Sequence, residues 1–261
     1  MTGIPFFQVD AFAERPLTGN PAGVMPLDRW LPDEVMQAIA AENNLSETAF
    51  TVPSESEDAD YDLRWFTPAT EVPLCGHASL AAGHILIHSD RVRFSTKSGI
   101  LTVTRRSDLL ELDLPAATLN QTDAPDLCAA LGLDTRPVWL ASPEFNDSAI
   151  IPLENEEEVL AVRPDFAALA GIRRMAIVTA PGTEQDIASR VFVPYVGIDE
   201  DPVTGSAHAA LVPYWAKRLG RTEFIALQAS ARRGVLHCRL QDDRVQLGGH
   251  CFTVIAGTFQ L

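Results

Sequence analysis

A thiol and an imidazole flank a glycine at the start of an apolar run. In EVPLCGHASLAAGHIL, residues 71–86, Cys75 and His77 stand on either side of Gly76, and Pro73 precedes them. Thiols and imidazoles transfer protons near neutral pH and ligate metals. A glycine just before a helix lets a ligand approach the backbone closely. The stretch therefore predicts a chemically reactive helix N-terminus.

The same arrangement recurs later in the chain. In DEDPVTGSAHAALVPYW, residues 199–215, Thr204 and Ser206 flank Gly205, and Asp201 stands just before them. An R-x-F-x-P segment precedes both stretches, starting at residues 64 and 190. Because strand, proline, glycine and Ala-rich helix recur in one order, the sequence indicates a duplicated supersecondary unit.

Two such helix N-termini would make an anion site. Each leaves up to four backbone N–H groups without a helical partner and carries a partial positive charge. Packed about a pseudo-two-fold axis, the two halves would form a cleft for a small carboxylate. Cys75 and His77 would line one lip, and Asp201, Thr204 and Ser206 the other. Each residue alone has a structural explanation, as a cap or a core residue, but their matched placement favours a site.

Strands flank single long apolar helices in each half. The segments 5–12, 46–52 and 61–68 read as strands, and 31–44 as a helix. This order favours an α+β fold over regular βαβ alternation. The polar stretch around 115–125 places a boundary between domains 1–117 and 118–249, with the last strand, 250–261, as a candidate to complete the first. The acidic run ENEEEV, residues 154–159, reads as a solvated face.

Composition excludes several classes of protein. The chain has 261 residues, a net charge of −15 and a pI of about 4.7, so a nucleic-acid partner is not expected. It has no apolar run of membrane-spanning length and no signal peptide, which predicts a cytoplasmic protein. His-Cys pairs end at Cys238 and Cys251 but lack the CxxC spacing of structural zinc sites. No metal site is therefore predicted. The sequence has no GxGxxG after a strand and no Walker A motif, so no nucleotide cofactor is predicted either.

Five segments resemble the phenazine-biosynthesis isomerase (PhzF-like) family, which has the diaminopimelate epimerase fold. They are DAFAERPLTGNPAGV, NNLSETAFTV, RWFTPATEVPLCGHASLAAGHIL, FVPYVGIDEDPVTGSAHAALVPYW and LQASARRGVL, which run in order through nearly the whole chain. The resemblance implies two similar domains, each a curled, mostly antiparallel sheet around a central helix. It also implies a homodimer and an enzyme that needs neither a metal nor pyridoxal phosphate.

The resemblance also implies roles for individual residues. The catalytic glutamate of the family falls on Glu47 in LSETAF, and its cleft-lining residues fall on His77, Asp201 and Ser206. Taken alone, Glu47 is either an exposed charge at a strand edge or a buried carboxyl. Burial would raise its pKa toward neutrality, which suits a group that takes a proton from carbon and returns it.

Thr204 departs from the two-thiol pattern of the racemases and epimerases that share this fold. A threonine hydroxyl is too weak an acid or base to replace a thiolate, so two-thiol racemisation is disfavoured. The sequence thus predicts an isomerase that moves a proton between carbons of a small, cyclic or conjugated carboxylic acid. Glu47 would be the acid/base, His77 and Asp201 would assist, and Gly76, Gly205, Ser206, Thr204 and Cys75 would line the substrate site.

Two alternatives remain open. One is a one-base epimerase of an amino acid or imino acid on the same scaffold. The other is a small-anion binding protein without turnover, against which the carboxylate of Glu47 argues, since anion binding has no use for it.

Overall fold

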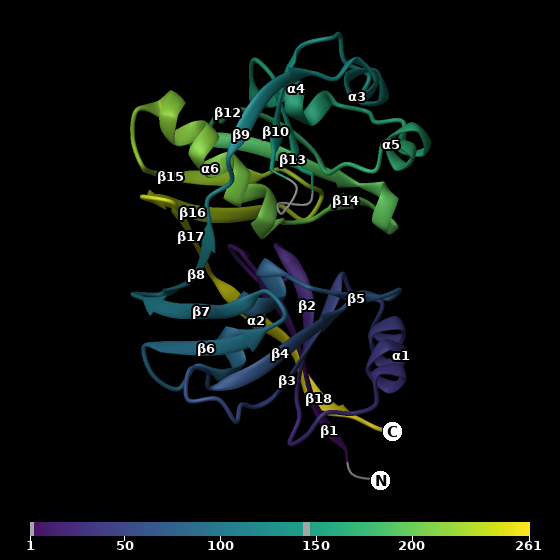
Figure 1. Cartoon of the computed structure of the whole chain (residues 1–261), viewed down its shortest axis with the longest axis vertical. Coiled ribbons are helices and arrows are strands. Elements are labelled where there is room, and N and C mark those ends of the chain that lie inside the picture. Colours follow the sequence, from purple (N-terminus) through teal and green to yellow (C-terminus); the bar gives the residue numbers. More distant parts are fainter. Residues whose placement is uncertain (1–2, 143–146) are drawn as a thin grey trace. The chain divides into compact units, whose positions relative to one another are not determined.

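The computed structural model describes residues 3–142 and 147–261 (Figure 1). The chain forms two compact units. The first unit comprises Met1–Asp113 and Gly248–Leu261, and the second unit comprises Leu114–Leu247. The chain passes between them within strand β8 (Leu109–Pro115) and again within β17 (Arg244–Gly249). The C-terminal segment Gly248–Leu261 thus belongs to the first unit.

The first unit is a mixed sheet curled around the helix α2 (Gly76–Leu86). Its strands pair in the order β18–β1–β2–β3–β4–β6–β7–β8. Strands from both ends of this order, β18 and β7, contact α2, which means that the sheet wraps the helix. The strands are β1 Ile4–Ala11, β2 Asn20–Pro26, β3 Glu47–Pro53, β4 Tyr61–Phe66, β5 Glu71–Val72, β6 Arg91–Thr96, β7 Gly99–Arg106 and β18 Cys251–Phe259.

The second unit repeats this pattern around the helix α6 (Gly205–Leu219). Its strands pair in the order β9–β10–β11–β12–β13–β15–β16, with β14 added to β13. They are β9 Leu119–Asp123, β10 Pro137–Ala141, β11 Ala149–Pro152, β12 Ala176–Pro181, β13 Ile187–Val193, β14 Ile198–Asp201, β15 Glu223–Gln228 and β16 Gly234–Gln241. A 3₁₀ turn, η2 (Pro194–Val196), links β13 to β14.

The pairing pattern confirms the duplication that the sequence indicates. In each unit two neighbouring pairs are parallel, β2–β3 and β4–β6 in the first and β11–β12 and β13–β15 in the second. The other pairs given above are antiparallel. Both central helices begin at the predicted glycine, Gly76 or Gly205.

The repeated arginines make the same contacts in both units. Arg64 donates two hydrogen bonds to Glu71, at 2.8 and 3.0 Å, and Arg190 donates two to Glu200, at 2.8 and 2.9 Å. These bidentate pairs tie β4 to β5 and β13 to β14, the strands that lead into the central helices. Hydrogen bonds from Arg64 lower the pKa of Glu71 to about 2.

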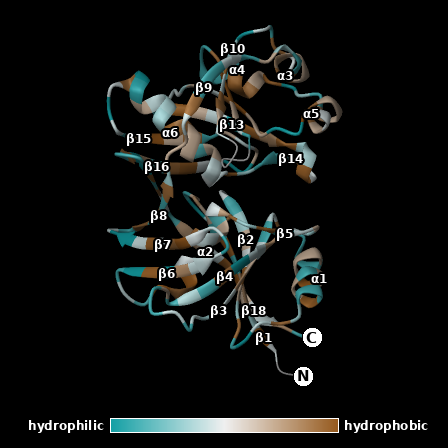
Figure 2. Ribbon diagram, in the orientation of Figure 1, coloured by the Kyte–Doolittle hydropathy of each residue, from teal (hydrophilic) through white to brown (hydrophobic). Residues whose placement is uncertain are grey.

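Both central helices are buried on nearly all sides. In α2 the buried positions are mostly Gly, Ala and Ser, which lets the surrounding strands approach closely. The helix α1 (Asp33–Asn43) lies outside the sheet and is amphipathic, with brown and teal residues side by side in Figure 2. Its Met36 and Ile39 pack on Phe50 and Phe66.

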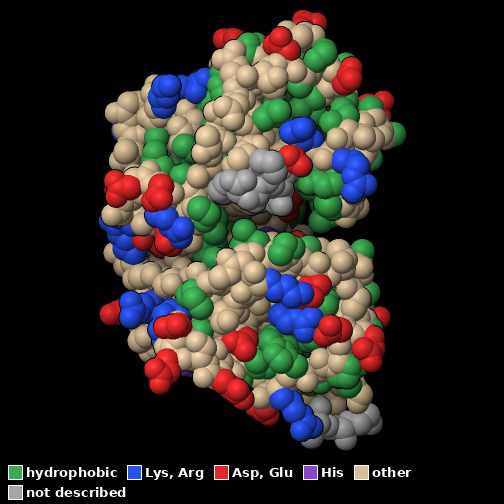
Figure 3. Space-filling model, in the orientation of Figure 1, with side chains coloured by type: hydrophobic (Ala, Val, Ile, Leu, Met, Phe, Trp, Pro, Cys, Tyr) green, Lys and Arg blue, Asp and Glu red, His purple; other side chains and the backbone are tan. Residues whose placement is uncertain are grey.

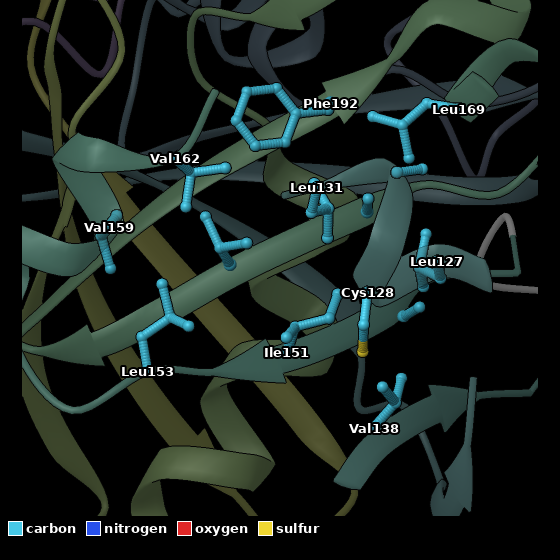
Figure 4. Packing of buried hydrophobic residues seen from close by; sticks show 14 of the residues in the cluster. Leu127, Cys128, Leu131, Val138, Ile151, Leu153, Val159, Val162, Leu169 and Phe192 are labelled. Atoms are coloured by element: carbon cyan, nitrogen blue, oxygen red, sulfur yellow. The ribbon is translucent and has the colours of Figure 1, made fainter. Parts of the chain in front are cut away.

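A second hydrophobic cluster fills the outer face of the second unit (Figure 4). The helices α3 (Pro125–Ala130), α4 (Glu156–Ala161) and α5 (Phe166–Ile172) pack Leu127, Val159 and Leu169 against strand residues such as Ile151 and Phe192. These helices therefore pack against the sheet of the second unit, as α1 packs against the sheet of the first.

Acidic side chains are spread over the face of the protein drawn in Figure 3, with basic side chains among them. The net charge of −15 is thus not gathered in a single patch on this face. In the part of the chain that the structure describes, no helix has the length and apolar character needed to span a membrane.

Candidate active site

The N-terminus of α2 carries the predicted thiol and imidazole. Cys75 is the N-cap and is extended (φ −147°, ψ 114°), and its carbonyl oxygen accepts hydrogen bonds from the backbone N–H and the hydroxyl of Ser79. The Cys75 side chain makes no capping hydrogen bond. The first N–H groups of α2 therefore receive no hydrogen bond from the side chain of the N-cap residue.

Glu47 lies beside this helix start. It is the first residue of β3, which runs parallel to β2. Its Oε2 atom lies 3.2 Å from Nε2 of His77, and the two side chains are only 15% and 5% exposed. Burial lowers the pKa of His77 to about 3, so the imidazole is neutral at pH 7. A largely buried carboxylate thus faces a neutral imidazole.

A short hydrogen-bond chain favours one nitrogen of His77 as the site of the ring proton. The Ser46 hydroxyl donates to Oδ1 of Asn20 at 3.2 Å, which turns the amide nitrogen of Asn20 toward His77. That nitrogen lies 3.3 Å from Nδ1 of the ring. Because an amide NH₂ only donates, this contact favours Nδ1 as the acceptor and a proton of the neutral ring on Nε2, on the side of Glu47.

Asn20→Asp is expected to move this proton. The carboxylate has the same shape as the amide but only accepts, so it favours a proton on Nδ1. Long-range ¹H–¹⁵N NMR of ring-labelled protein distinguishes the two tautomers. The Nε2–H form is expected in the parent protein and the Nδ1–H or doubly protonated form in the variant. An unchanged ring spectrum would contradict the role assigned to Asn20, and Asn43→Asp, at another side-chain amide of this unit, is the control.

Cys75 completes a compact cluster in the first unit. Its sulfur lies 3.5 Å from Nδ1 of His77, and the residue is 7% exposed. Among the described residues, one group of three His, Cys, Asp or Glu side chains has ligand atoms that all lie within 4.8 Å of one another. It consists of Glu47, Cys75 and His77. These are the residues that could hold a metal ion.

The N-terminus of α6 is built around a carboxylate. Thr204 is its N-cap, but the hydroxyl donates a short hydrogen bond to Oδ2 of Asp201 instead of capping the helix. Gln228, which is fully buried, accepts from the Thr204 N–H at 2.8 Å and donates to the carbonyl of Asp201 at 2.8 Å and to Oγ1 of Thr204 at 3.2 Å. The turn that holds the Asp201 carboxylate is therefore tied to β15.

The structure groups the predicted residues by unit. Glu47, Cys75 and His77 come together at the first residue of α2, Gly76. In the second unit Asp201 and Thr204 are hydrogen-bonded, and Gly205 and the partly buried Ser206 are the first two residues of α6. The roles given to these residues, and a cleft shared by the two helix starts, stay predictions.

Three polar residues were missed by the sequence analysis: Asn20, Ser46 and Gln228. A signal existed for all three. Asn20, at the start of β2, and Ser46, directly before Glu47, lie in segments quoted for the family resemblance. Gln228 is a lone amide at the end of the apolar strand FIALQ. A buried side-chain amide needs hydrogen-bond partners, so such a residue in a strand is a candidate for a site.

Comparisons with known proteins agree with the family resemblance. Residues 9–257 match the family described as phenazine biosynthesis-like protein (PhzC-PhzF). The chain is 49% identical to an uncharacterized isomerase of Pseudomonas aeruginosa over 99% of both chains. It also superposes on the crystal structure of a phenazine biosynthesis protein of the PhzF family from Enterococcus faecalis, with a TM-score of 0.89 and 42% identity over 100% of each chain.

The fold is shared more widely. A probable proline racemase from Agrobacterium radiobacter matches with a TM-score of 0.67 at 12% identity, covering 99% of this chain and 93% of that one. This likeness, together with the match to the Enterococcus structure, confirms the predicted α+β, epimerase-like fold.

Proposed function

Because this chain belongs to the PhzC-PhzF family of phenazine biosynthesis-like proteins, we propose that it is an isomerase that moves a proton between carbons of a small carboxylic acid. The observation that carries the proposal is the pair formed by Glu47 and His77. A carboxylate only 15% exposed lies 3.2 Å from a neutral imidazole nitrogen. Such a carboxylate, with little water around it, is suited to take a proton from carbon and return it elsewhere.

The other residues have supporting roles in this proposal. The backbone N–H groups at the start of α2 bind the substrate carboxylate. The Nε2–H group of His77 donates to the negative charge that develops when the carbon loses its proton. In the second unit Asp201 assists proton movement, and Ser206 and the N–H groups that follow Gly205 bind substrate. None of these steps calls for a metal or pyridoxal phosphate.

Thr204 has a role different from that of an acid or base. Its hydroxyl hydrogen-bonds Asp201, so it orients that carboxylate. We expect Thr204→Val to lower kcat about tenfold, because a hydrogen bond to a charged group contributes about 1.5–3 kcal/mol. Thr204→Ser keeps the hydroxyl and is expected to retain kcat. Steady-state kinetics measure kcat of both variants. An equal loss of kcat in Thr204→Val and Thr204→Ser would contradict this role.

A one-base epimerase of an amino acid or imino acid is the second candidate. The likeness in fold to a proline racemase and the buried Cys75 beside His77 favour it. It differs from the first in its product, because an epimerase inverts one carbon whereas an isomerase moves a hydrogen to another. A protein that only binds small anions is a third reading, in which the cluster performs no turnover.

Solvent deuterium uptake separates these candidates. Purified protein in D₂O is incubated with small cyclic, conjugated and amino carboxylic acids, and mass spectrometry and NMR locate the label. Deuterium at a new carbon of a cyclic or conjugated acid supports the isomerase. Label only at an inverted α-carbon supports the epimerase. Cys75→Ala is included, because uptake lost in this variant would move the acid/base role to the thiol. Binding without uptake across the panel would contradict turnover.

A further inference from the structure

The cluster of Glu47, Cys75 and His77 has the composition of a metal site as well as of an acid/base site. We propose that it binds a divalent transition-metal ion of the Zn²⁺ type, as an inhibitor and not as a cofactor. A carboxylate oxygen, a sulfur and a ring nitrogen lie within 4.8 Å of one another on side chains that are largely buried.

One of the three ligand separations matches that of a metal-bound set. In a tetrahedral zinc site with sulfur, nitrogen and oxygen ligands, neighbouring ligand atoms lie about 3.3–3.6 Å apart. Here Oε2 of Glu47 lies 3.2 Å from Nε2 of His77, and the sulfur of Cys75 lies 3.5 Å from Nδ1. Since the ring coordinates through one nitrogen only, just one of these two distances belongs to the bound set. The other two separations, at most 4.8 Å each, must shorten by up to about 1.3 Å, which side-chain rotation supplies.

Asn20 is placed to serve the metal-bound state too. Metal-bound histidines usually donate their other ring N–H to a fixed acceptor. When Nε2 of His77 binds the ion, Nδ1 carries the proton, and rotation of the Asn20 amide presents its oxygen to it. The Ser46 hydroxyl, which donates to Asn20 in the metal-free arrangement, then accepts from the amide nitrogen.

The donor types select the ion. Thiolate and imidazole suit Zn²⁺, Co²⁺ and related ions, whereas Mg²⁺ and Ca²⁺ prefer sets made of oxygen. The thiolate of Cys75 and the carboxylate of Glu47 together balance the two charges of the ion, which a buried site requires. The N-terminus of α2 opposes a cation but favours the thiolate that the cation needs.

The expected consequence is a blocked site. An ion held by Glu47 occupies the carboxylate that would otherwise take a proton from carbon. Three protein ligands leave one coordination position for water or a substrate carboxylate. The binding itself does not depend on the proposed isomerase reaction, so it is measured without substrate.

Titration with Co²⁺ tests the proposal on the whole protein, in buffer without thiol reductants. A single equivalent is expected to produce the near-ultraviolet band of a cobalt–thiolate bond together with visible bands of tetrahedral Co²⁺, and Zn²⁺ is expected to bleach both. Cys75→Ser should abolish the near-ultraviolet band, and Glu47→Gln should weaken binding at least about tenfold.

Cys251→Ala is the matched control, because Cys251 is another free cysteine of the first unit and is remote from the cluster in sequence. It should titrate like the parent protein. The proposal would be overturned if the Cys75→Ser variant still showed a cobalt–thiolate band. It would also be overturned if the parent protein showed no such band at millimolar Co²⁺. Urea unfolding of each variant shows that it is folded, and Cys75→Ala replaces Cys75→Ser if the latter is not.

Discussion

Glu47→Gln is expected to slow deuterium exchange into the substrate about 1,000-fold, because general acid–base catalysis contributes roughly 10²- to 10⁴-fold. The amide has the size of the carboxylate but cannot take a proton from carbon. Substrate binding should persist, since the N–H groups of α2 and the His77 ring are unchanged. Exchange rates are read by NMR with the acid that the parent protein labels.

A matched variant separates catalysis from stability. The Glu111 side chain is also 15% exposed and belongs to the first unit, where it pairs with Arg106 at 3.2 Å. Glu111→Gln should exchange at the parent rate. Glu47→Asp keeps the carboxylate but draws it back by one methylene group, so an intermediate rate is expected. Exchange in Glu47→Gln at the parent rate would remove this residue from the mechanism.

Acid is expected to destabilise the protein through its buried, neutral histidines. Nδ1 of His208 lies 2.8 Å from the carbonyl oxygen of Thr204 and therefore carries the proton. Nε2 is buried and has no hydrogen-bond partner among the described residues. Burial lowers the pKa of His208 to about 4. Since the ordinary pKa is about 6.5, the unfolded chain takes up a proton between pH 6.5 and 4 and the folded protein does not.

The sign of the effect follows from this difference. The stability linked to His208 is complete above about pH 6.5 and declines as the pH falls, by roughly 2 kcal/mol at pH 5. The His208→Gln variant keeps a donor for the Thr204 carbonyl but does not titrate. Its free energy of unfolding in urea should therefore fall less between pH 7.5 and pH 5, by roughly that amount. Equal falls in the variant and the parent protein would contradict the assignment, and His77→Gln offers the same comparison in the first unit.

The acidic run ENEEEV contains the start of a helix that the sequence analysis did not predict. It reads as a solvated face, but its residues begin α4, because Asn155 caps the helix by accepting a hydrogen bond from the Glu158 N–H at 2.9 Å. Asn155, a residue type common at helix N-caps, and the apolar Val159 are the two sequence features that indicate this helix. Charge density alone did not reveal them, since a short amphipathic helix needs only one or two buried side chains to pack.

The sequence by itself determined where the two central helices begin and that they belong to a duplicated unit. Those features depend on local rules: an extended residue, a glycine, an apolar run and a repeated R-x-F-x-P strand. The sequence proposed Glu47 as a site residue only through family resemblance, since alternation within a strand does not distinguish a buried carboxyl from an exposed one.

Only the tertiary structure decided which groups meet. Glu47 reaches His77 because parallel pairing of β2 and β3 sets its register beside α2, and Asn20 reaches the same ring from 57 positions away. Gln228 likewise joins the turn at Thr204 across 24 positions. Such contacts depend on strand register, burial and side-chain rotamers, and these are fixed by packing between distant segments rather than by any local pattern of residues.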